Sequence, residues 1–230
     1  MLLTERRGPV ALVTIDRAER RNALSIGLME AMVEQLDELE SNGTRAVVLT
    51  GAGAVFCSGA DFEELRAHGS ALEDALAGLT ERLLASPLPI VGAVNGPCVG
   101  GGVELAMACD IRVCDESAFF EIPATKLGVL YRPDGLDLLA SRLPHQTVAR
   151  LFHVNDRIPA ADAVAAGLVA AVTPRGASVA AALSFVDHQQ DLRADVVAST
   201  KARLREIEAR SVDVEGWHEE RARFMERLTE

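Results

Sequence analysis

Four short apolar runs recur along the chain, separated by segments long enough to hold a helix. They cover residues 10–15, 46–49, 90–94 and 111–114, and each is rich in valine or isoleucine. Runs of this length and composition are typical of strands. The segment between the first two runs has helical spacing, which predicts a βαβ unit and a parallel sheet. The pattern therefore indicates an α/β protein.

Apolar residues at helical spacing mark the segments around these strands. Ser25 is placed to cap the first helix, and the apolar positions behind it are Leu28, Met29, Met32, Val33, Leu36 and Leu39. Further helices are expected at residues 63–65, 72–84, 136–143, 158–167, 177–186, 192–209 and 214–228. A short strand is expected after Gly167, a loop or edge strand at 117–126, and a loop at 128–135.

The segment 87–110 (PLPIVGAVNGPCVGGGVELAMACD) is the centre of the predicted chemistry. A strand at 90–94 is followed by the Asn95-Gly96-Pro97 turn, three glycines at 100–102 and a small-residue helix. A helix N-terminus presents free N–H groups that favour negative charge, and glycine lets a ligand approach the main chain. Glu104 falls in the first helical turn. A second loop of small residues, 51–62, leaves the preceding strand in the same way.

Each of these features also has a purely structural explanation. Three glycines at a strand exit serve tight helix–strand packing as readily as ligand approach. A glutamate in the first turn of a helix interacts favourably with the helix dipole whether or not it is catalytic. The residues alone leave both interpretations open.

Composition narrows the classes of partner. The 230 residues are 49% apolar and carry a net charge of −11, which argues against a nucleic acid or an anionic membrane as the main partner. No stretch approaches the roughly 20 apolar residues of a membrane span, and the first residues lack the apolar run of a signal peptide. The four cysteines form no CxxC pair, so we expect reduced core cysteines in a cytoplasmic protein.

Several familiar sites are excluded by spacing. Neither Gly51-Gly53 nor Gly100-Gly102 has the third glycine of a dinucleotide-binding fingerprint. The five histidines are scattered and form no metal-binding motif, so no metal is expected. Ser58 lacks the preceding glycine of a nucleophile elbow, which argues against a serine hydrolase.

Four motifs together resemble the enoyl-CoA hydratase/isomerase (crotonase) superfamily. They are RRNALS, FCSGADF, PIVGAVNGPCVGGGVELAMACD and AADAVAAGLVAAVTP, in family order and near family spacing, over roughly residues 8 to 174. The resemblance implies a crotonase-like ββα spiral at residues 1–174 that holds the acyl-CoA site. It also implies a short helical segment at 175–230 that serves oligomerisation, as a homotrimer or a dimer of trimers.

The resemblance implies a substrate carried as a coenzyme A thioester, with no cofactor beyond the coenzyme A of the substrate itself. The backbone N–H groups of Ala60 and Gly101 would hold the thioester oxygen as it becomes an enolate, and Glu104 would be the general acid or base. The residues expected along the coenzyme A path are Arg21, Ala23, Leu24, Ser58, Ala60, Asp61, Phe62 and Gly101.

The sequence departs from the hydratase pattern at one position. The second glutamate of the family normally follows a proline, but Pro123 is followed by Ala124. Glu121 and Asp134 are nearby carboxylates that could take its part, or could be solvated loop residues. We therefore expect a lyase or isomerase of the hydratase/isomerase type. The alternatives are a catalytically silent acyl-CoA-binding protein, or a decarboxylase or dehalogenase that uses Asp134 or Glu121.

Overall fold

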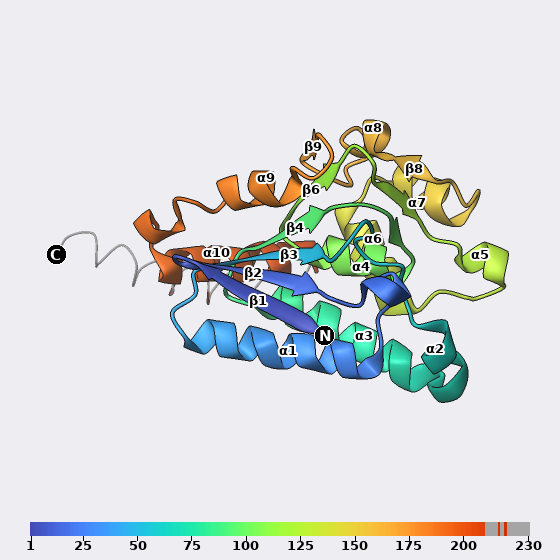
Figure 1. Cartoon of the computed structure of the whole chain (residues 1–230), viewed down its shortest axis with the longest axis horizontal. Coiled ribbons are helices and arrows are strands. Elements are labelled where there is room, and N and C mark those ends of the chain that lie inside the picture. Colours follow the sequence, from blue (N-terminus) through green and yellow to red (C-terminus); the bar gives the residue numbers. More distant parts are fainter. Residues whose placement is uncertain (210–215, 217–218, 220–230) are drawn as a thin grey trace.

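The computed structural model describes residues 1–209, Gly216 and Glu219 of the chain (Figure 1). Its strands are β1 (Leu2–Arg7), β2 (Val10–Ile15), β3 (Ala46–Gly51), β4 (Ile90–Val94), β5 (Cys98–Val99), β6 (Ile111–Asp115), β7 (Phe119–Glu121), β8 (Ile158–Pro159) and β9 (Ala171–Thr173). Its α-helices are α1 (Ile26–Ser41), α2 (Phe62–His68), α3 (Ser70–Ala85), α4 (Gly101–Ala108), α5 (Ala124–Leu127), α6 (Pro133–Arg142), α7 (His145–Phe152), α8 (Ala160–Ala163), α9 (Ser178–Ser184) and α10 (Ala194–Glu208). Two 3₁₀ turns lie at Ala18–Arg20 and Gln189–Asp191.

The main sheet has six strands in the order β1-β2-β3-β4-β6-β9. Strands β2, β3, β4, β6 and β9 run parallel to their neighbours, while β1 pairs antiparallel with β2 at the edge. Parallel neighbours need crossover connections, which α1, α3 and α4 supply. The carboxyl ends of β3 and β4 therefore emerge side by side, and the two small-residue loops predicted from the sequence follow those ends.

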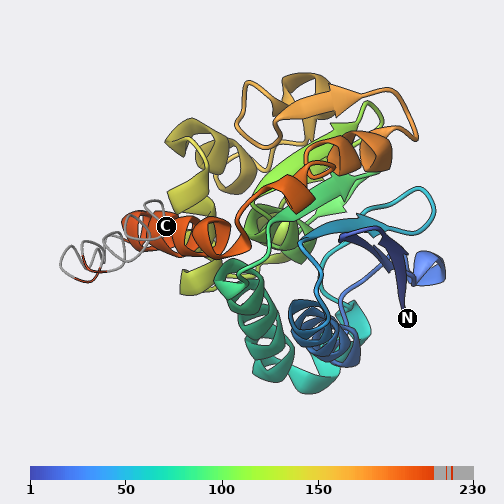
Figure 2. The same cartoon turned by 90° about the vertical axis from the view of Figure 1, so that its left-hand side faces the viewer.

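The two faces of the sheet carry separate layers of packing because successive strand residues point to opposite sides. Ala11 and Val13 of β2 face the larger core, which contains the apolar residues of α1, α3 and α4. Val10 and Leu12 face the opposite side and pack in a smaller cluster with Ala182 of α9. Figure 2 shows α1 and α3 below the sheet and α9 on its other side.

Helix α1 begins where the sequence predicts. The Ser25 side chain accepts a hydrogen bond from the Leu28 N–H at 3.3 Å, which satisfies one of the free donors of the first turn. Leu28, Met29, Met32, Leu36 and Leu39 are all buried. The predicted amphipathic face is therefore confirmed.

Several predicted elements need correction. Residues 117–126 contain β7, which is the central strand of a second sheet (β5-β7-β8) and not an edge. The segment expected as a helix from residue 158 begins as β8, because Ile158 pairs with Phe120, and becomes helical only at Ala160.

Further differences concern two helices and the first strand. Helix α6 begins at Pro133, a favoured first-turn position for proline, so Asp134 lies in its first turn and not in a loop. Strand β1 and helix α7 were not predicted. The predicted helix at 214–228 lies outside the described residues.

The small sheet ties the centre of the chain to the glycine-rich corner. Cys98 and Val99 of β5 pair with Phe120 and Glu121 of β7. The Gly100 N–H then donates to the Glu121 carbonyl at 2.8 Å. These bonds fix the strand that leads into α4.

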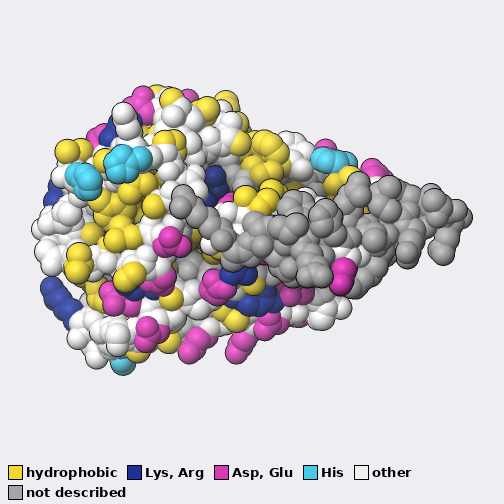
Figure 3. Space-filling model, turned by 180° about the vertical axis from the view of Figure 1, so that it is seen from behind, with side chains coloured by type: hydrophobic (Ala, Val, Ile, Leu, Met, Phe, Trp, Pro, Cys, Tyr) yellow, Lys and Arg dark blue, Asp and Glu magenta, His cyan; other side chains and the backbone are white. Residues whose placement is uncertain are grey.

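Helix α10 follows α9 in the chain, and Lys201 is one of the residues that anchor it. Lys201 Nζ donates to the Leu88 carbonyl at 2.8 Å and to Asp110 Oδ2 at 2.7 Å. None of the helices in the described part of the chain combines the length and apolar character that crossing a membrane requires. On the rear face, Figure 3 shows acidic and basic side chains interspersed beside patches of hydrophobic ones.

Candidate functional site

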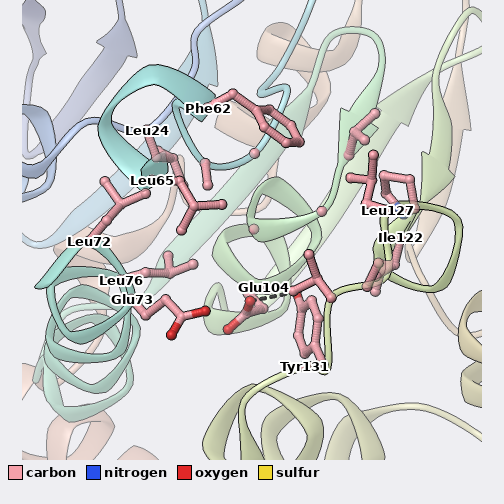
Figure 4. Close-up of a pocket in the computed structure, with 18 of the residues that line it drawn as sticks. Leu24, Phe62, Leu65, Leu72, Glu73, Leu76, Glu104, Ile122, Leu127 and Tyr131 are labelled. Atoms are coloured by element: carbon pink, nitrogen blue, oxygen red, sulfur yellow. Dashed lines mark hydrogen bonds between the residues drawn. The ribbon is translucent and has the colours of Figure 1, made fainter. Parts of the chain in front are cut away.

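A pocket lies where the exits of β3 and β4 meet the N-termini of α2, α3 and α4 (Figure 4). Its empty volume is about 800 Å³, including space open to solvent. Apolar residues, among them five leucines, form most of its wall, and Ser58, Glu73, Glu104, Tyr131 and Arg132 are its polar side chains. An apolar cleft with a few converging polar groups is the usual form of a small-molecule site.

Two backbone corners meet at this pocket. The segment 57–61 pairs with the RRNAL segment through Leu24, whose N–H donates to the Gly59 carbonyl and whose carbonyl accepts from the Asp61 N–H, both at 2.8 Å. On its other side the Val99 N–H donates to the Cys57 carbonyl at 2.9 Å. These bonds hold the first corner, at Gly59 and Ala60, against the second, at Gly100 and Gly101.

Glycine is required for this close approach. Gly59 has a φ of +88°, and a Cβ there would lie 2.7 Å from the Val99 carbonyl oxygen and 3.1 Å from the Gly101 nitrogen. A Cβ on Gly101 would lie 3.7 Å from the Ala60 nitrogen. The amide nitrogens of Ala60 and Gly101 are therefore neighbours.

Both amides are available to a ligand. Within residues 1–209, neither the Ala60 N–H nor the Gly101 N–H donates to another group of the chain. Gly101 is the first residue of α4, where the macrodipole adds positive potential. Two free donors side by side at a helix N-terminus form a site for an oxygen with negative charge.

Glu104 lies one helical turn beyond Gly101 and is almost completely buried, with 3% of its side chain exposed. Tyr131 Oη donates to its Oε1 at 2.5 Å, and Arg132 Nη2 donates to its Oε2 at 2.7 Å. Burial raises the pKa of Glu104 above the ordinary glutamate value, although Tyr131 and Arg132 act in the opposite direction. Burial and the adjacent Glu104 also raise the pKa of Tyr131 well above its usual range. Perturbed groups in a cleft are typical of acid–base sites.

Arg132 joins three helices around Glu104. Besides its bond to Glu104 on α4, its Nη1 donates to the Glu73 carbonyl on α3 at 2.9 Å and to Asp134 Oδ2 on α6 at 2.8 Å. Gly135 leaves the space for this arrangement, since a Cβ there would lie 2.7 Å from Glu104 Oε2. The carboxylate is therefore fixed in position on both oxygens.

The RRNAL and SGADF segments are held together by side chains that do not line the pocket. Asn22, with a φ of +56°, donates to the Ala52 and Val55 carbonyls at 3.0 and 2.7 Å. Arg17 donates to the Ala23 carbonyl at 2.7 Å and pairs with Asp61 at 3.1 Å, while Asp61 caps α2. Burial would raise the pKa of Asp61, but Arg17 and the backbone N–H groups that Asp61 caps lower it overall. Both interactions position the backbone of the first corner.

The expected coenzyme A residues divide into two groups. Leu24, Ser58, Ala60, Phe62 and Gly101 line the pocket, whereas Ala23 and Asp61 are buried behind it. The Arg21 side chain is exposed, and its carbonyl accepts from the Ser58 N–H at 3.1 Å. No carboxylate in the described part of the chain pairs with Arg21. The Arg21 guanidinium is therefore available to bind an anion, and its backbone is hydrogen-bonded to Ser58, which lines the pocket.

The two substitute carboxylates lie elsewhere. Glu121 is outside the pocket lining and pairs with Lys126 at 3.2 Å and with Arg157 at 2.8 Å. Burial would raise the pKa of Glu121, but these two cations outweigh it and lower that pKa. Asp134 is also outside the lining, 55% exposed, and pairs with Arg132. Ala124 does line the pocket, at the start of α5. The structure therefore brings Glu104, Ala60 and Gly101 together and leaves Glu121 and Asp134 aside.

Glu73, Tyr131 and Arg132 were not identified from the sequence. Glu73 directly follows Leu72 of the buried α3 stripe, a weak signal that it borders the core. Tyr131 and Arg132 were read as loop residues. Within the described residues, no three histidine, cysteine, aspartate or glutamate side chains gather as a metal ion would require, and all four cysteines are free and buried.

Comparison with known proteins gives consistent matches. The family model described as enoyl-CoA hydratase/isomerase matches residues 5–228. A probable enoyl-CoA hydratase, echA6 of Mycobacterium bovis, is 36% identical over 159 residues, which are 69% of this chain and 65% of that protein, slightly less than two thirds of its length.

Solved structures agree over nearly the whole chain. The Pseudomonas aeruginosa protein PA4980 has a TM-score of 0.85 at 34% identity, covering 96% of this chain and 97% of that one. An enoyl-CoA hydratase/carnithine racemase from Magnetospirillum magneticum has a TM-score of 0.90 at 27% identity, covering 97% and 87%. The α/β crotonase-like fold expected from the sequence is confirmed.

Proposed function

Because the chain belongs to the enoyl-CoA hydratase/isomerase family, we propose that it processes acyl-CoA thioesters through an enolate held by the Ala60 and Gly101 N–H groups. The observation that carries this proposal is the pair of neighbouring, unused amide donors beside Glu104. Activity, substrate and assembly are all part of the proposal.

The two amides would act on the thioester oxygen. Negative charge develops on that oxygen when the thioester becomes an enolate, and the fold has already fixed both donors before the substrate binds. A preorganised donor of this kind contributes about 2.7–4 kcal/mol to transition-state stabilisation. The helix dipole of α4 adds to the same effect.

Glu104 would move the proton. Its place one turn beyond Gly101 puts a carboxylate next to the carbons attached to the thioester. Its raised pKa brings it closer to neutral pH, where a general acid or base is most effective. Tyr131 and Arg132 would orient it and stabilise its ionised form.

The coenzyme A part would follow the RRNAL and SGADF segments. Arg21 offers an exposed guanidinium, without an ion-pair partner among the described residues, for a phosphate, while Leu24 and Phe62 offer apolar contact. Coenzyme A belongs to the substrate in this proposal, and the reaction requires no separate cofactor or metal. A lyase or isomerase of the hydratase/isomerase type fits these groups, with Ala124 at the position of the second family glutamate.

A second candidate function is a catalytically silent acyl-CoA-binding protein. Both oxygens of Glu104 already accept hydrogen bonds, and Ala124 provides no acid–base group. Such a protein would keep the amide pair and bind acyl-CoA without turnover.

The short C-terminal segment, 175–230, would serve assembly into a homotrimer or a dimer of trimers. Leu204 and Ile207 of α10 are 57% and 46% exposed, and a second copy would cover them. The mass measured by light scattering distinguishes monomer, trimer and hexamer.

The activity test uses crotonyl-CoA and a panel of longer and branched 2-enoyl and 3-enoyl thioesters, followed by loss of enoyl absorbance and by product mass. Turnover that falls about 100-fold or more with Glu104→Gln, but not with Glu30→Gln on the exposed side of α1, supports the enzyme. Tight binding with no turnover supports the silent binder. Turnover that depends on Asp134 or Glu121 and not on Glu104 supports the decarboxylase or dehalogenase alternative.

A further inference from the structure

Glu73 is the second carboxylate of the pocket. It lies in the first turn of α3, partly buried, and lines the same wall as Leu72 and Leu76. Figure 4 shows its carboxylate pointing toward that of Glu104, which comes from the facing helix α4. The two acidic side chains in the lining thus oppose one another from different elements.

The Glu73 carboxylate differs from the other candidate carboxylates in having no partner in the part of the chain that the structure describes. Glu104 accepts from Tyr131 and Arg132, Glu121 pairs with two cations, and Asp134 pairs with Arg132. Within the described residues, no hydrogen bond or ion pair reaches the Glu73 carboxylate. It is therefore free to exchange a proton with a substrate.

The backbone of Glu73 is nevertheless fixed relative to Glu104. Arg132 donates through Nη1 to the Glu73 carbonyl at 2.9 Å and through Nη2 to Glu104 Oε2 at 2.7 Å. One planar guanidinium therefore sets the spacing of the two residues.

Elimination leaves Glu73 as the remaining proton carrier. Ala124 has no titratable group, the Arg132 guanidinium already donates to the Glu73 carbonyl, Glu104 and Asp134, and the Tyr131 hydroxyl is committed to Glu104. Ser58 is the other hydroxyl in the lining, and an unassisted serine is a poor acid at neutral pH. Water addition across a double bond needs one group to take a proton and another to give one.

We propose that Glu73 is a second catalytic residue, which supplies the proton-donating carboxyl group that position 124 lacks; this inference rests on the proposed function. Ionised Glu104 takes a proton from water, and the water oxygen bonds to Cβ of the enoyl thioester. The π electrons move to the thioester oxygen as an enolate. A proton relayed by the Glu73 carboxyl group is then added to Cα as the enolate collapses. A proton passes from Glu104 to Glu73 through solvent, so the net change is one water added.

The test compares Glu73→Gln with Asp74→Asn, the adjacent carboxylate, which is exposed and outside the lining. We expect Glu73→Gln to lower kcat for crotonyl-CoA or the best enoyl-CoA of the panel by about 10²–10⁴. It should leave KM and the Kd of a saturated acyl-CoA within about twofold. Glu73→Asp recovers part of the rate, and Asp74→Asn leaves it unchanged.

A second readout separates catalysis from folding. Exchange of the Cα protons of butyryl-CoA in D2O, followed by NMR, should slow by a similar factor in Glu73→Gln, because this exchange needs the group that serves Cα. A Glu73→Gln variant with kcat and Cα exchange within about threefold of wild type would overturn the role of Glu73. Turnover by the wild-type protein would still leave the proposed function standing. No turnover by wild type on any thioester would overturn the proposed function and this role with it.

Discussion

Glu104 and Arg132 form an ion pair inside the candidate pocket, with 2.7 Å between Oε2 and Nη2. Their side chains are 3% and 14% exposed, so neither charge is well hydrated. A buried carboxylate is stable only when a partner compensates its lost hydration. Arg132 therefore both supports the fold around the pocket and opposes the rise that burial causes in the pKa of Glu104.

Removing the arginine leaves Glu104 uncompensated. Arg132→Met should lower the free energy of unfolding by about 3–5 kcal/mol at neutral pH, measured by urea denaturation. Adding Glu104→Gln to this variant should recover part of the loss, because the unpaired charge is then gone. Arg150→Met, which breaks the more exposed Arg150–Asp156 pair, should cost far less, because solvent screens that pair. Equal losses for the two arginines would contradict this account of the pair.

The raised pKa of Glu104 makes stability depend on pH in a definite direction. The folded state holds the proton of Glu104 above pH 4.5, the ordinary glutamate value, where the unfolded state releases it. The favourable contribution of Glu104 to the free energy of unfolding is therefore fully present below pH 4.5. It is lost as the pH rises through the pKa of Glu104 in the folded state. Urea denaturation across this range should show that wild type loses stability relative to Glu104→Gln as pH rises. The opposite slope would show a lowered pKa.

The Tyr131 hydroxyl lowers the pKa of Glu104 against the effect of burial. Tyr131→Phe keeps the ring, which contacts Phe152 at 4.9 Å between centroids, but removes the donor. The pKa of Glu104 should rise further, and the acidic limb of the kcat–pH profile should move to higher pH. A limb that stays in place or moves to lower pH would show that Glu104 does not control it.

Gly135 provides room for the Glu104 carboxylate. A Cβ there would lie 2.7 Å from Glu104 Oε2 and 2.9 Å from Tyr131 Cε1, so Gly135→Ala should cost about 1–3 kcal/mol of stability and lower kcat. Gly78→Ala is the matched control, because it is also a helical glycine but has nothing within 4 Å of its added Cβ. The control should gain about 0.5–1 kcal/mol. Thermal unfolding and turnover are measured on both, and a harmless Gly135→Ala would contradict this packing.

Asn22 holds the RRNAL loop to the exit of β3. Asn22→Ala removes its two donated bonds and the one it accepts from the Arg17 N–H at 3.0 Å, so stability should fall by at least about 2 kcal/mol. Acyl-CoA affinity should fall with it. Asn155 also has a positive φ, of 50°, but only long side-chain contacts of 3.4 Å, so Asn155→Ala isolates the effect of backbone strain. Equal unfolding energies for the two variants would mean that the Asn22 bonds contribute little.

The parallel sheet and the two glycine-rich corners could be predicted because local sequence determines them. Valine-rich runs form β3 and β4, Ser25 caps α1, and glycine is required where the two corners meet. Strand β1 (LLTERR) escaped prediction because it is an exposed edge strand without an alternating pattern.

The surroundings of Glu104 could not be predicted in the same way. Tyr131 and Arg132 lie 27 and 28 residues beyond Glu104 and reach it only through the packing of α6 on α4. The leucine stripe of α3 indicates which face is buried, but not that Glu73 at its border faces Glu104. Similarly, Glu121 is near Ala124 in the sequence, yet Lys126 and Arg157 hold its carboxylate outside the pocket.

The central claim is that the Ala60 and Gly101 amides bind one thioester oxygen. A crystal structure of the protein with a non-hydrolysable acyl-CoA analogue tests it most directly. We predict a carbonyl oxygen about 2.7–3.1 Å from both nitrogens, with the acyl chain directed toward Glu104. A carbonyl turned away from either amide, or an analogue bound outside this pocket, would contradict the account.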